Sequence, residues 1–405
     1  MMALRSPAFR RLWCSSLAST AAQGMERTVT AWLALEVGGG AFAVGLIFAA
    51  RMLPSLLFGL AAGTIADRAN RVHQLLVVAG AALVLMATFG WIVGLGGLRV
   101  WQVVVFAFVA GSVHVFDTPA RQALVLDTVP RETAATALAL TALAARFASA
   151  VGAIGAGALI PLAGVARSYL VIAGAFGLAV LLVATLRVPQ EHRVLVTMPP
   201  FSQSFHDASR LMIDLPTVRT LMIAGVVCEI FAFSFMSALP LFAQDVLAVG
   251  VEGLGALNAA VAIGGAIAVA LLALLPGRIE RQPVLGAVFL VYGMSLLSLA
   301  LTSDLLIAAA VMVVTGCCAG AFDVLQQTLI QLAVPDQQRG RAVGLWVLSI
   351  GSAPVGHLEM GTLISALGVP AALLINGTVT VVAAAVLLWQ APAYRWTWRA
   401  RSKPQ

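Results

Sequence analysis

The chain has 405 residues, of which 61% are apolar and only 10% are charged, and its formal net charge is +7. An average soluble domain has roughly 45–50% apolar and about 25% charged residues. A chain of this length with so few charges cannot cover a water-exposed surface. The composition therefore excludes an ordinary soluble protein, and the excess apolar side chains are expected to face lipid.

Twelve apolar stretches are long enough to be transmembrane helices, since crossing the hydrocarbon core takes about 20 residues. Runs this long and uniform do not match the alternating pattern of a membrane barrel, so the predicted fold class is an all-α membrane protein with twelve transmembrane helices. The stretches centre on residues 12–37, 42–62, 74–97, 100–118, 136–159, 168–186, 219–243, 253–276, 284–302, 305–328, 342–365 and 370–390. The one long polar break, 188–218, predicts two six-helix bundles, residues 1–187 and 219–405, joined by a linker.

The basic residues are distributed unevenly along this predicted topology. Most of the 24 lie in the N-terminal tail, the even-numbered loops, the linker and the C-terminal tail, whereas Arg99 and Arg167 lie in the opposite loops. The positive-inside rule then places both termini and the linker in the cytoplasm. No basic stripe is interleaved with aromatic residues, so a nucleic-acid partner is not expected.

Motifs for catalysis and for metal or nucleotide binding are missing from the sequence. There is no phosphate-binding loop, no H-E-x-x-H zinc site and no G-x-S-x-G elbow, so the chain is expected to be neither an enzyme nor an ATP-driven pump. Cys14, Cys228, Cys317 and Cys318 all lie in apolar stretches without metal spacing. We therefore expect no cofactor and no metal.

Two segments resemble each other across the halves. FDTPARQALVLDTVP (116–130) ends the fourth predicted span and FDVLQQTLIQLAVP (322–335) ends the tenth. Both spans run in the same direction, so a two-fold axis along the membrane normal would relate the halves.

The loop after the second predicted span carries the most specific motif. GTIADRANR resembles the major facilitator signature G-x-x-x-D-R-x-G-R-R/K, with matches at Gly63, Asp67, Arg68 and Arg71. Asn70 stands where the family has glycine, and asparagine is expected there because it tolerates positive φ. Further stretches, such as DTPARQAL, LPLFAQDVL and VPDQQRGRAVGLW, resemble the branch that contains the enterobactin exporter and the macrolide efflux pumps.

This resemblance implies a major facilitator transporter of a prokaryotic plasma (inner) membrane, acting as a monomer. It implies secondary active export of a small amphiphilic organic molecule, either a siderophore-like metabolite or a drug, with proton antiport as the expected coupling. The antiporter signature in the fifth span is incomplete, because Ala153 stands where a proline is expected. An uptake carrier of the same fold and a non-transporting membrane sensor or scaffold remain as alternatives.

Polar residues within the spans are candidate functional groups, because an intramembrane charge is costly. One polar stripe runs down the first span at helical spacing and is expected to line a cavity: Ser16, Thr20, Gln23, Arg27 and Thr30. Glu26, beside this stripe, is the first choice for the residue that carries the proton. Glu229 in the seventh span and His357 with Glu359 in the eleventh are the further candidates for proton coupling or substrate contact, against a role in interhelical hydrogen bonds.

A cytoplasmic gate is expected at the ends of the second, fourth and tenth spans. Its predicted members are Gly63, Asp67, Arg68 and Arg71 of the loop signature, Asp117 and Arg121 of the fourth span, and Asp323 of the tenth. His114, Asp117 and Arg121 share one helix face, and the four-residue spacing of the last two favours an intrahelical ion pair. Arg51 and Arg146 are expected to have packing or counter-charge roles.

Overall fold

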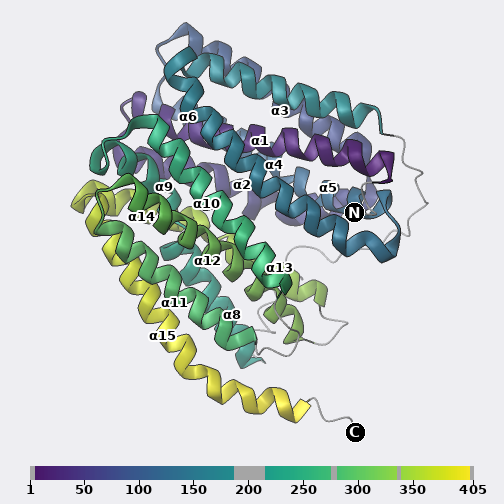
Figure 1. The fold of residues 1–405 in the computed structure, drawn as a ribbon, viewed down its shortest axis with the longest axis vertical. Coiled ribbons are helices and arrows are strands. Elements are labelled where there is room, and N and C mark those ends of the chain that lie inside the picture. Colours follow the sequence, from purple (N-terminus) through teal and green to yellow (C-terminus); the bar gives the residue numbers. More distant parts are fainter. Residues whose placement is uncertain (1–4, 187–214, 275–280, 335–338, 402–405) are drawn as a thin grey trace.

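The structure is a computed structural model that describes residues 5–186, 215–274, 281–334 and 339–401. Every regular element in these ranges is a helix, and most helices run along one common direction (Figure 1). Within the described residues, nine helices are long and apolar enough to cross a membrane. The all-α membrane class is therefore confirmed.

The N-terminal half, as we call the part before residue 187, begins with a capped helix. The Ser6 hydroxyl accepts a hydrogen bond from the Phe9 amide, and Pro7 occupies the first helical position, where its missing N–H costs nothing. The helices of this half are α1 (Pro7–Glu36), α2 (Gly40–Arg68), α3 (Arg71–Leu95), α4 (Val100–Val115), α5 (Asp117–Thr128) and α6 (Arg131–Ala184).

Two departures from regular helix divide this half. Gly164 has φ 81°, a conformation that suits glycine, so α6 turns there and contains both the fifth and the sixth predicted spans. The fourth predicted span is broken at Phe116, between α4 and α5. Asn70 has φ −64° and caps α3 by accepting from the His73 amide, so the expectation of positive φ there was wrong.

The C-terminal half, the part after residue 214, contains a seventh predicted span with irregular turns. Its helices are α8 (Pro216–Val227), α9 (Phe235–Leu241), α10 (Gly250–Leu274), α11 (Arg281–Ala300), α12 (Leu305–Leu332), α13 (Arg339–Ile350), α14 (Ala353–Leu367) and α15 (Val369–Arg401). Two π-helical turns, η2 (Cys228–Ala232) and η3 (Phe242–Val246), flank α9. Such turns are frequent at functional sites, and η2 contains Glu229.

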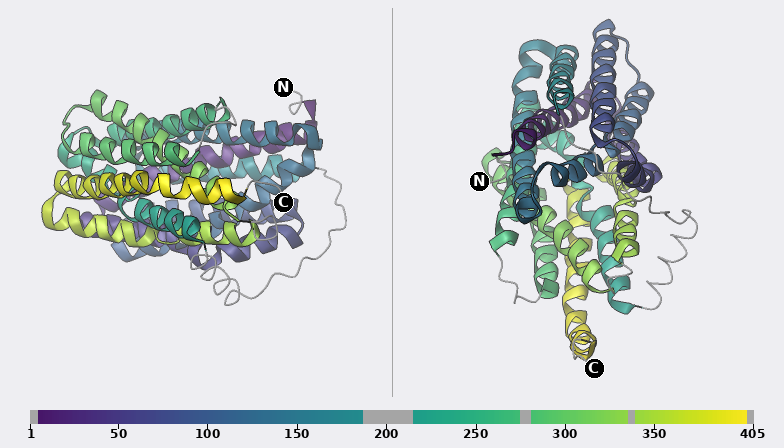
Figure 2. Two further views of the ribbon diagram at one scale, coloured as in Figure 1. Left: turned by 90° about the horizontal axis from the view of Figure 1, so that it is seen from below. Right: turned by 90° about the vertical axis from the view of Figure 1, so that its right-hand side faces the viewer.

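Packing within each half precedes packing between them. In the N-terminal half α1 and α3 pack on α6, and α2 packs on α4; in the C-terminal half α10 packs on α12 and α11 on α15. The two halves meet where α10 packs on α6 and where α14 packs on α2, and the side views in Figure 2 show both halves side by side. Large apolar side chains remain on the outside, for example Leu162 at 83% and Trp389 at 82% exposure, as expected for a surface that faces lipid.

Glycines bring the halves together at one end. Near the start of α2, Gly45 lies against the backbone of His357 and Gly361 in α14. Near the start of α10, Gly255 lies against the backbone of Ala153 and Gly157 in α6. A Cβ atom at either glycine would collide with the facing backbone, so only glycine permits this approach. Gly63, towards the other end of α2, has no such neighbour within 4 Å.

Candidate functional site

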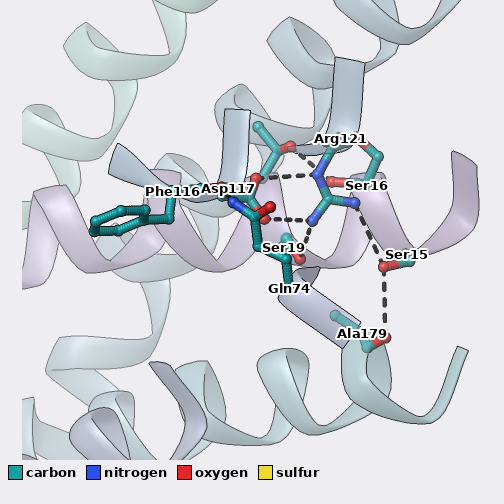
Figure 3. A network of polar contacts seen from close by, with 9 residues as sticks. Ser15, Ser16, Ser19, Gln74, Phe116, Asp117, Arg121 and Ala179 are labelled. Carbon is teal, nitrogen blue, oxygen red and sulfur yellow. Dashed lines mark hydrogen bonds and ion pairs between the residues drawn. The ribbon is translucent and has the colours of Figure 1, made fainter. Parts of the chain in front are cut away.

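A buried ion pair lies at the junction of α4 and α5 (Figure 3). Arg121 donates to the Asp117 carboxylate through Nε at 3.0 Å and Nη2 at 2.7 Å, which confirms the pair expected from the spacing. The same guanidinium reaches the hydroxyl of Ser19 at 3.2 Å and that of Ser15 at 3.5 Å on α1. The break at Phe116 places Asp117 in the first turn of α5, where a carboxylate favours the helix.

The other expected gate residues lie on neighbouring segments. Arg71, at the start of α3, donates to both carboxylate oxygens of Asp127 at 2.8 and 3.0 Å and thereby joins α3 to the end of α5. Gly63 lies in α2. The side chains of Asp67 and Arg68 lie outside the part that the structure describes, so their role in the gate stays a prediction.

Glu26 is fully buried between helices of the N-terminal half. Its Oε1 accepts from Arg51 Nη1 at 2.6 Å and from the Thr30 hydroxyl at 3.3 Å. Thr30 in turn hydrogen-bonds to the Tyr169 hydroxyl at 2.8 Å. Two members of the predicted first-span group are therefore turned towards α6 and α2, and Arg51 has the counter-charge role expected of it.

A polar cavity of about 320 Å³ lies beside this ion pair, between the two halves. Gln23, Arg51, Ser55, His114 and Thr118 contribute polar groups from the N-terminal half, while Val347 and Ile350 close it from α13. Among the described residues, neither ring nitrogen of His114 has a hydrogen-bond partner. Two other cavities, lined mainly by apolar side chains of α3 and α4, lack this charge.

Three arginines gather at the same level of the N-terminal half. Arg27 donates to the Ser149 hydroxyl at 2.8 Å and interacts electrostatically with Arg51, Arg146 and Glu26. The Arg146 guanidinium lies against Gly265 of α10 and therefore reaches the boundary between the halves. Glu26 is the one carboxylate in this group, which leaves an excess of two positive charges.

The C-terminal half presents carboxylates instead. Glu229 of η2 and Asp323 of α12 are half-buried and interact electrostatically with each other. Arg146 acts on Asp323 from the other half. Among the side chains that the structure describes, neither carboxylate forms an ion pair. Asp323, expected at the gate from its place in the repeat, thus lies beside a candidate for proton coupling.

His357 and Glu359 make separate contacts although they are close in sequence. His357 is buried, its Nδ1 lies 3.3 Å from the Ser237 hydroxyl, and its ring packs against Phe48 of α2 at 5.4 Å. Glu359 accepts from the Asn376 amide of α15 at 3.1 Å. The structure therefore does not bring these two side chains together as one site.

The sequence interpretation missed the cavity as a site. It gave Arg51 and Arg146 packing or counter-charge roles and gave His114 a place on a gating face, whereas the structure puts Arg51 and His114 on one cavity wall. An intramembrane charge is a signal for function, and Arg51 already carried it. Among the described residues no group of histidine, cysteine and acidic side chains could hold a metal ion, and the four cysteines are free.

Curated relatives of this chain are transporters. The multidrug efflux pump Tap of Mycobacterium tuberculosis is 27% identical over 383 residues, which cover 91% of this chain and 90% of that protein. The staphyloferrin A transporter of Staphylococcus aureus is 22% identical over 362 residues, 86% of this chain and 88% of that protein. None of these relatives is an enzyme, which agrees with the expectation for this chain.

Solved structures share the fold at low identity. The nucleoside transporter NupG, as its D323A mutant, aligns with a TM-score of 0.77 and 13% identity over 94% of this chain and 99% of that one. A bacterial homologue of the human lysosomal transporter Spinster, in an inward-facing and unoccupied conformation, aligns with a TM-score of 0.69 and 16% identity over 96% of both chains. Residues 1–399 match the family described as transmembrane secretion effector. The chain therefore belongs to this family of major facilitator superfamily transporters.

Proposed function

We propose that this protein is a secondary active exporter of small amphiphilic organic molecules, driven by protons that enter the cell. Twelve crossings form two six-helix bundles, residues 1–187 and 219–405, joined by a linker at 188–218. The protein lies as a monomer in the prokaryotic plasma (inner) membrane, with both termini in the cytoplasm. The distribution of basic residues supports this orientation.

The observation that carries the proposal is the charged cavity between the halves. It combines Arg51 and the unpaired His114 with apolar Met52, Val347 and Ile350, so both ends of an amphiphilic molecule find a partner there. The glycine contacts at Gly45 and Gly255 close the opposite end of the molecule. With the N-terminus in the cytoplasm, this arrangement corresponds to an inward-open state that loads substrate from inside the cell.

Export is supported by the relatives, one of which is a multidrug efflux pump and another a siderophore transporter. In this reading the gate comprises the loop signature of Gly63, Asp67, Arg68 and Arg71 and the ion pair of Asp117 with Arg121. It closes the cytoplasmic end when the halves rock to the outward-open state.

Protons couple to export through Glu229 and Asp323. Two carboxylates that lie together in a low-dielectric region disfavour a doubly ionised state, so one of them binds a proton. A basic group of the substrate competes with that proton for the same site, as an antiporter requires. Glu26 is less suited to this task than the sequence indicated, because Arg51 already neutralises its carboxylate. His357 and Glu359 serve as neighbouring contacts in the C-terminal half.

Transport by the purified protein in sealed liposomes tests this proposal. Liposomes with the cytoplasmic face outward are made acidic inside, and a fluorescent amphiphilic amine is added outside. We expect accumulation that collapses when a protonophore is added. Accumulation only with the opposite pH gradient would indicate an uptake carrier, and no movement under either gradient, with the fold intact, would indicate a non-transporting sensor or scaffold.

A further inference from the structure

We propose that the cavity beside Arg51 is a subsite for an acidic group of the substrate. The inference deepens the proposed export function and rests on it. A substrate that places a carboxylate here and a basic group near Glu229 and Asp323 is amphoteric. The substrate class is therefore amphiphilic molecules that carry both an acidic and a basic group on an apolar body.

The charge balance around the cavity favours an anion. Arg27, Arg51 and Arg146 interact electrostatically, while Glu26 supplies one negative charge. The neighbouring charges, Asp117 and Arg121, already neutralise each other. Charges held in apolar surroundings are costly when they are not compensated. An anionic group in the cavity would compensate one of the two excess positive charges.

The polar atoms on the cavity wall suit a carboxylate. Arg51 is 11% exposed and uses Nη1 for Glu26, and its guanidinium has further N–H groups for a second acceptor. A guanidinium binds a carboxylate through parallel, charge-assisted hydrogen bonds. Gln23 adds an amide on the same wall. His114 adds ring nitrogens that have no hydrogen-bond partner among the described residues.

The opposite wall explains where the rest of the molecule goes. Met52, Val347 and Ile350 present apolar surface to the cavity, which suits an apolar body rather than a second charge. Across the boundary between the halves, Glu229 and Asp323 provide negative charge without an ion-pair partner among the described side chains. The two walls thus differ in sign, and an amphoteric molecule matches both.

The test compares an amphiphilic amino acid with its methyl ester, which keeps the amine and the body but loses the anionic charge. Binding to the full-length protein in lipid nanodiscs is measured by calorimetry. We expect the wild-type protein to bind the acid at least about tenfold more tightly than the ester, the ratio typical of one charge-assisted hydrogen bond. Equal affinity for acid and ester in the wild-type protein overturns the subsite.

Two variants identify the subsite residues. The double variant Glu26→Gln/Arg51→Gln removes both charges of the ion pair together, so no unpaired ion stays buried, and the acid-to-ester ratio is expected to fall close to one. His114→Ala breaks no hydrogen bond of the described residues and is expected to reduce the ratio severalfold. Val347→Ala is the matched control, because it lines the same cavity without a polar group and should weaken both ligands equally. An unchanged ratio in both His114→Ala and the double variant contradicts the assignment.

This binding test separates the subsite from the proposed function. If the acid is preferred but proton-driven accumulation fails, the subsite stands and the coupling proposal is wrong. If accumulation is proton-driven for amine, acid and ester alike, export stands and the subsite is wrong.

Discussion

Arg51 and Glu26 illustrate how one ion pair can both stabilise a helix bundle and shape a binding cavity. Glu26 is completely buried, and its carboxylate depends on Arg51 and Thr30 for hydrogen bonds. Its second oxygen, Oε2, has no hydrogen-bond partner among the described residues. Removing the arginine would leave an uncompensated buried carboxylate, whereas removing both charges would not.

The stability of single and double variants checks this pair. Breaking a buried ion pair by removing one partner typically costs about 3–5 kcal/mol. We therefore expect Arg51→Gln to lower the melting temperature of the purified protein clearly, and Glu26→Gln/Arg51→Gln to lower it less than Arg51→Gln alone. Additive losses in the double variant would show that the two groups do not interact.

Glu229 and Glu359 differ in their surroundings, and this difference predicts different roles. Glu229 has Asp323 as its electrostatic neighbour, whereas Glu359 is held by the Asn376 amide. Glu229→Gln is expected to abolish accumulation driven by a pH gradient while downhill exchange of substrate continues. Glu359→Gln, which preserves the hydrogen bond with Asn376, should retain most of that accumulation. Wild-type accumulation by Glu229→Gln would remove it from the proton pathway.

Glycines determine how closely α2 approaches α14 and α10 approaches α6. The two contacts occupy matching places, because Gly45 and Gly255 lie near the starts of α2 and α10 and each faces another glycine across the boundary, Gly361 or Gly157. Small residues at such positions let helix backbones pack tightly in lipid. The closed end of the structure therefore depends on four residues without side chains.

Gly255→Ala should destabilise this closed end and shift the protein towards the outward-open state. Distances between spin labels across the closed end are expected to lengthen in Gly255→Ala relative to the wild-type protein. Gly80→Ala in α3 is the control, since a Cβ atom there meets nothing within 4 Å. An unchanged distance distribution in Gly255→Ala would mean that the contact yields without opening.

Sequence patterns predicted the positions of the helices better than their breaks and partners. Each predicted span falls on helical residues, because long apolar stretches in lipid have few alternatives to a helix. The break at Phe116 and the π-helical turn around Glu229 were missed, since neither follows from hydropathy. The spacing of Asp117 and Arg121 was enough to predict their pair, whereas the pairing of Glu26 with Arg51 depends on how α1 and α2 are rotated about their axes.

Orientation in the membrane is a property of the complete chain and rests on the basic loops. A single cysteine introduced within residues 38–41, in a background without the four native cysteines, should react with an impermeant reagent added to intact cells. A single cysteine within residues 190–200 should react only after the membrane is opened. Labelling of the second position in intact cells would reverse the topology.

Release of protons on substrate binding tests the central claim most directly, because the claim is that substrate and proton compete at Glu229 and Asp323. The purified protein is mixed with an amphoteric ligand in weakly buffered detergent solution, and the pH is followed with a soluble dye. We predict release of protons by the wild-type protein and none by the variant Glu229→Gln/Asp323→Asn, although that variant still binds ligand. Uptake of protons on binding, or no change in pH with wild-type protein that binds the ligand, would contradict the account.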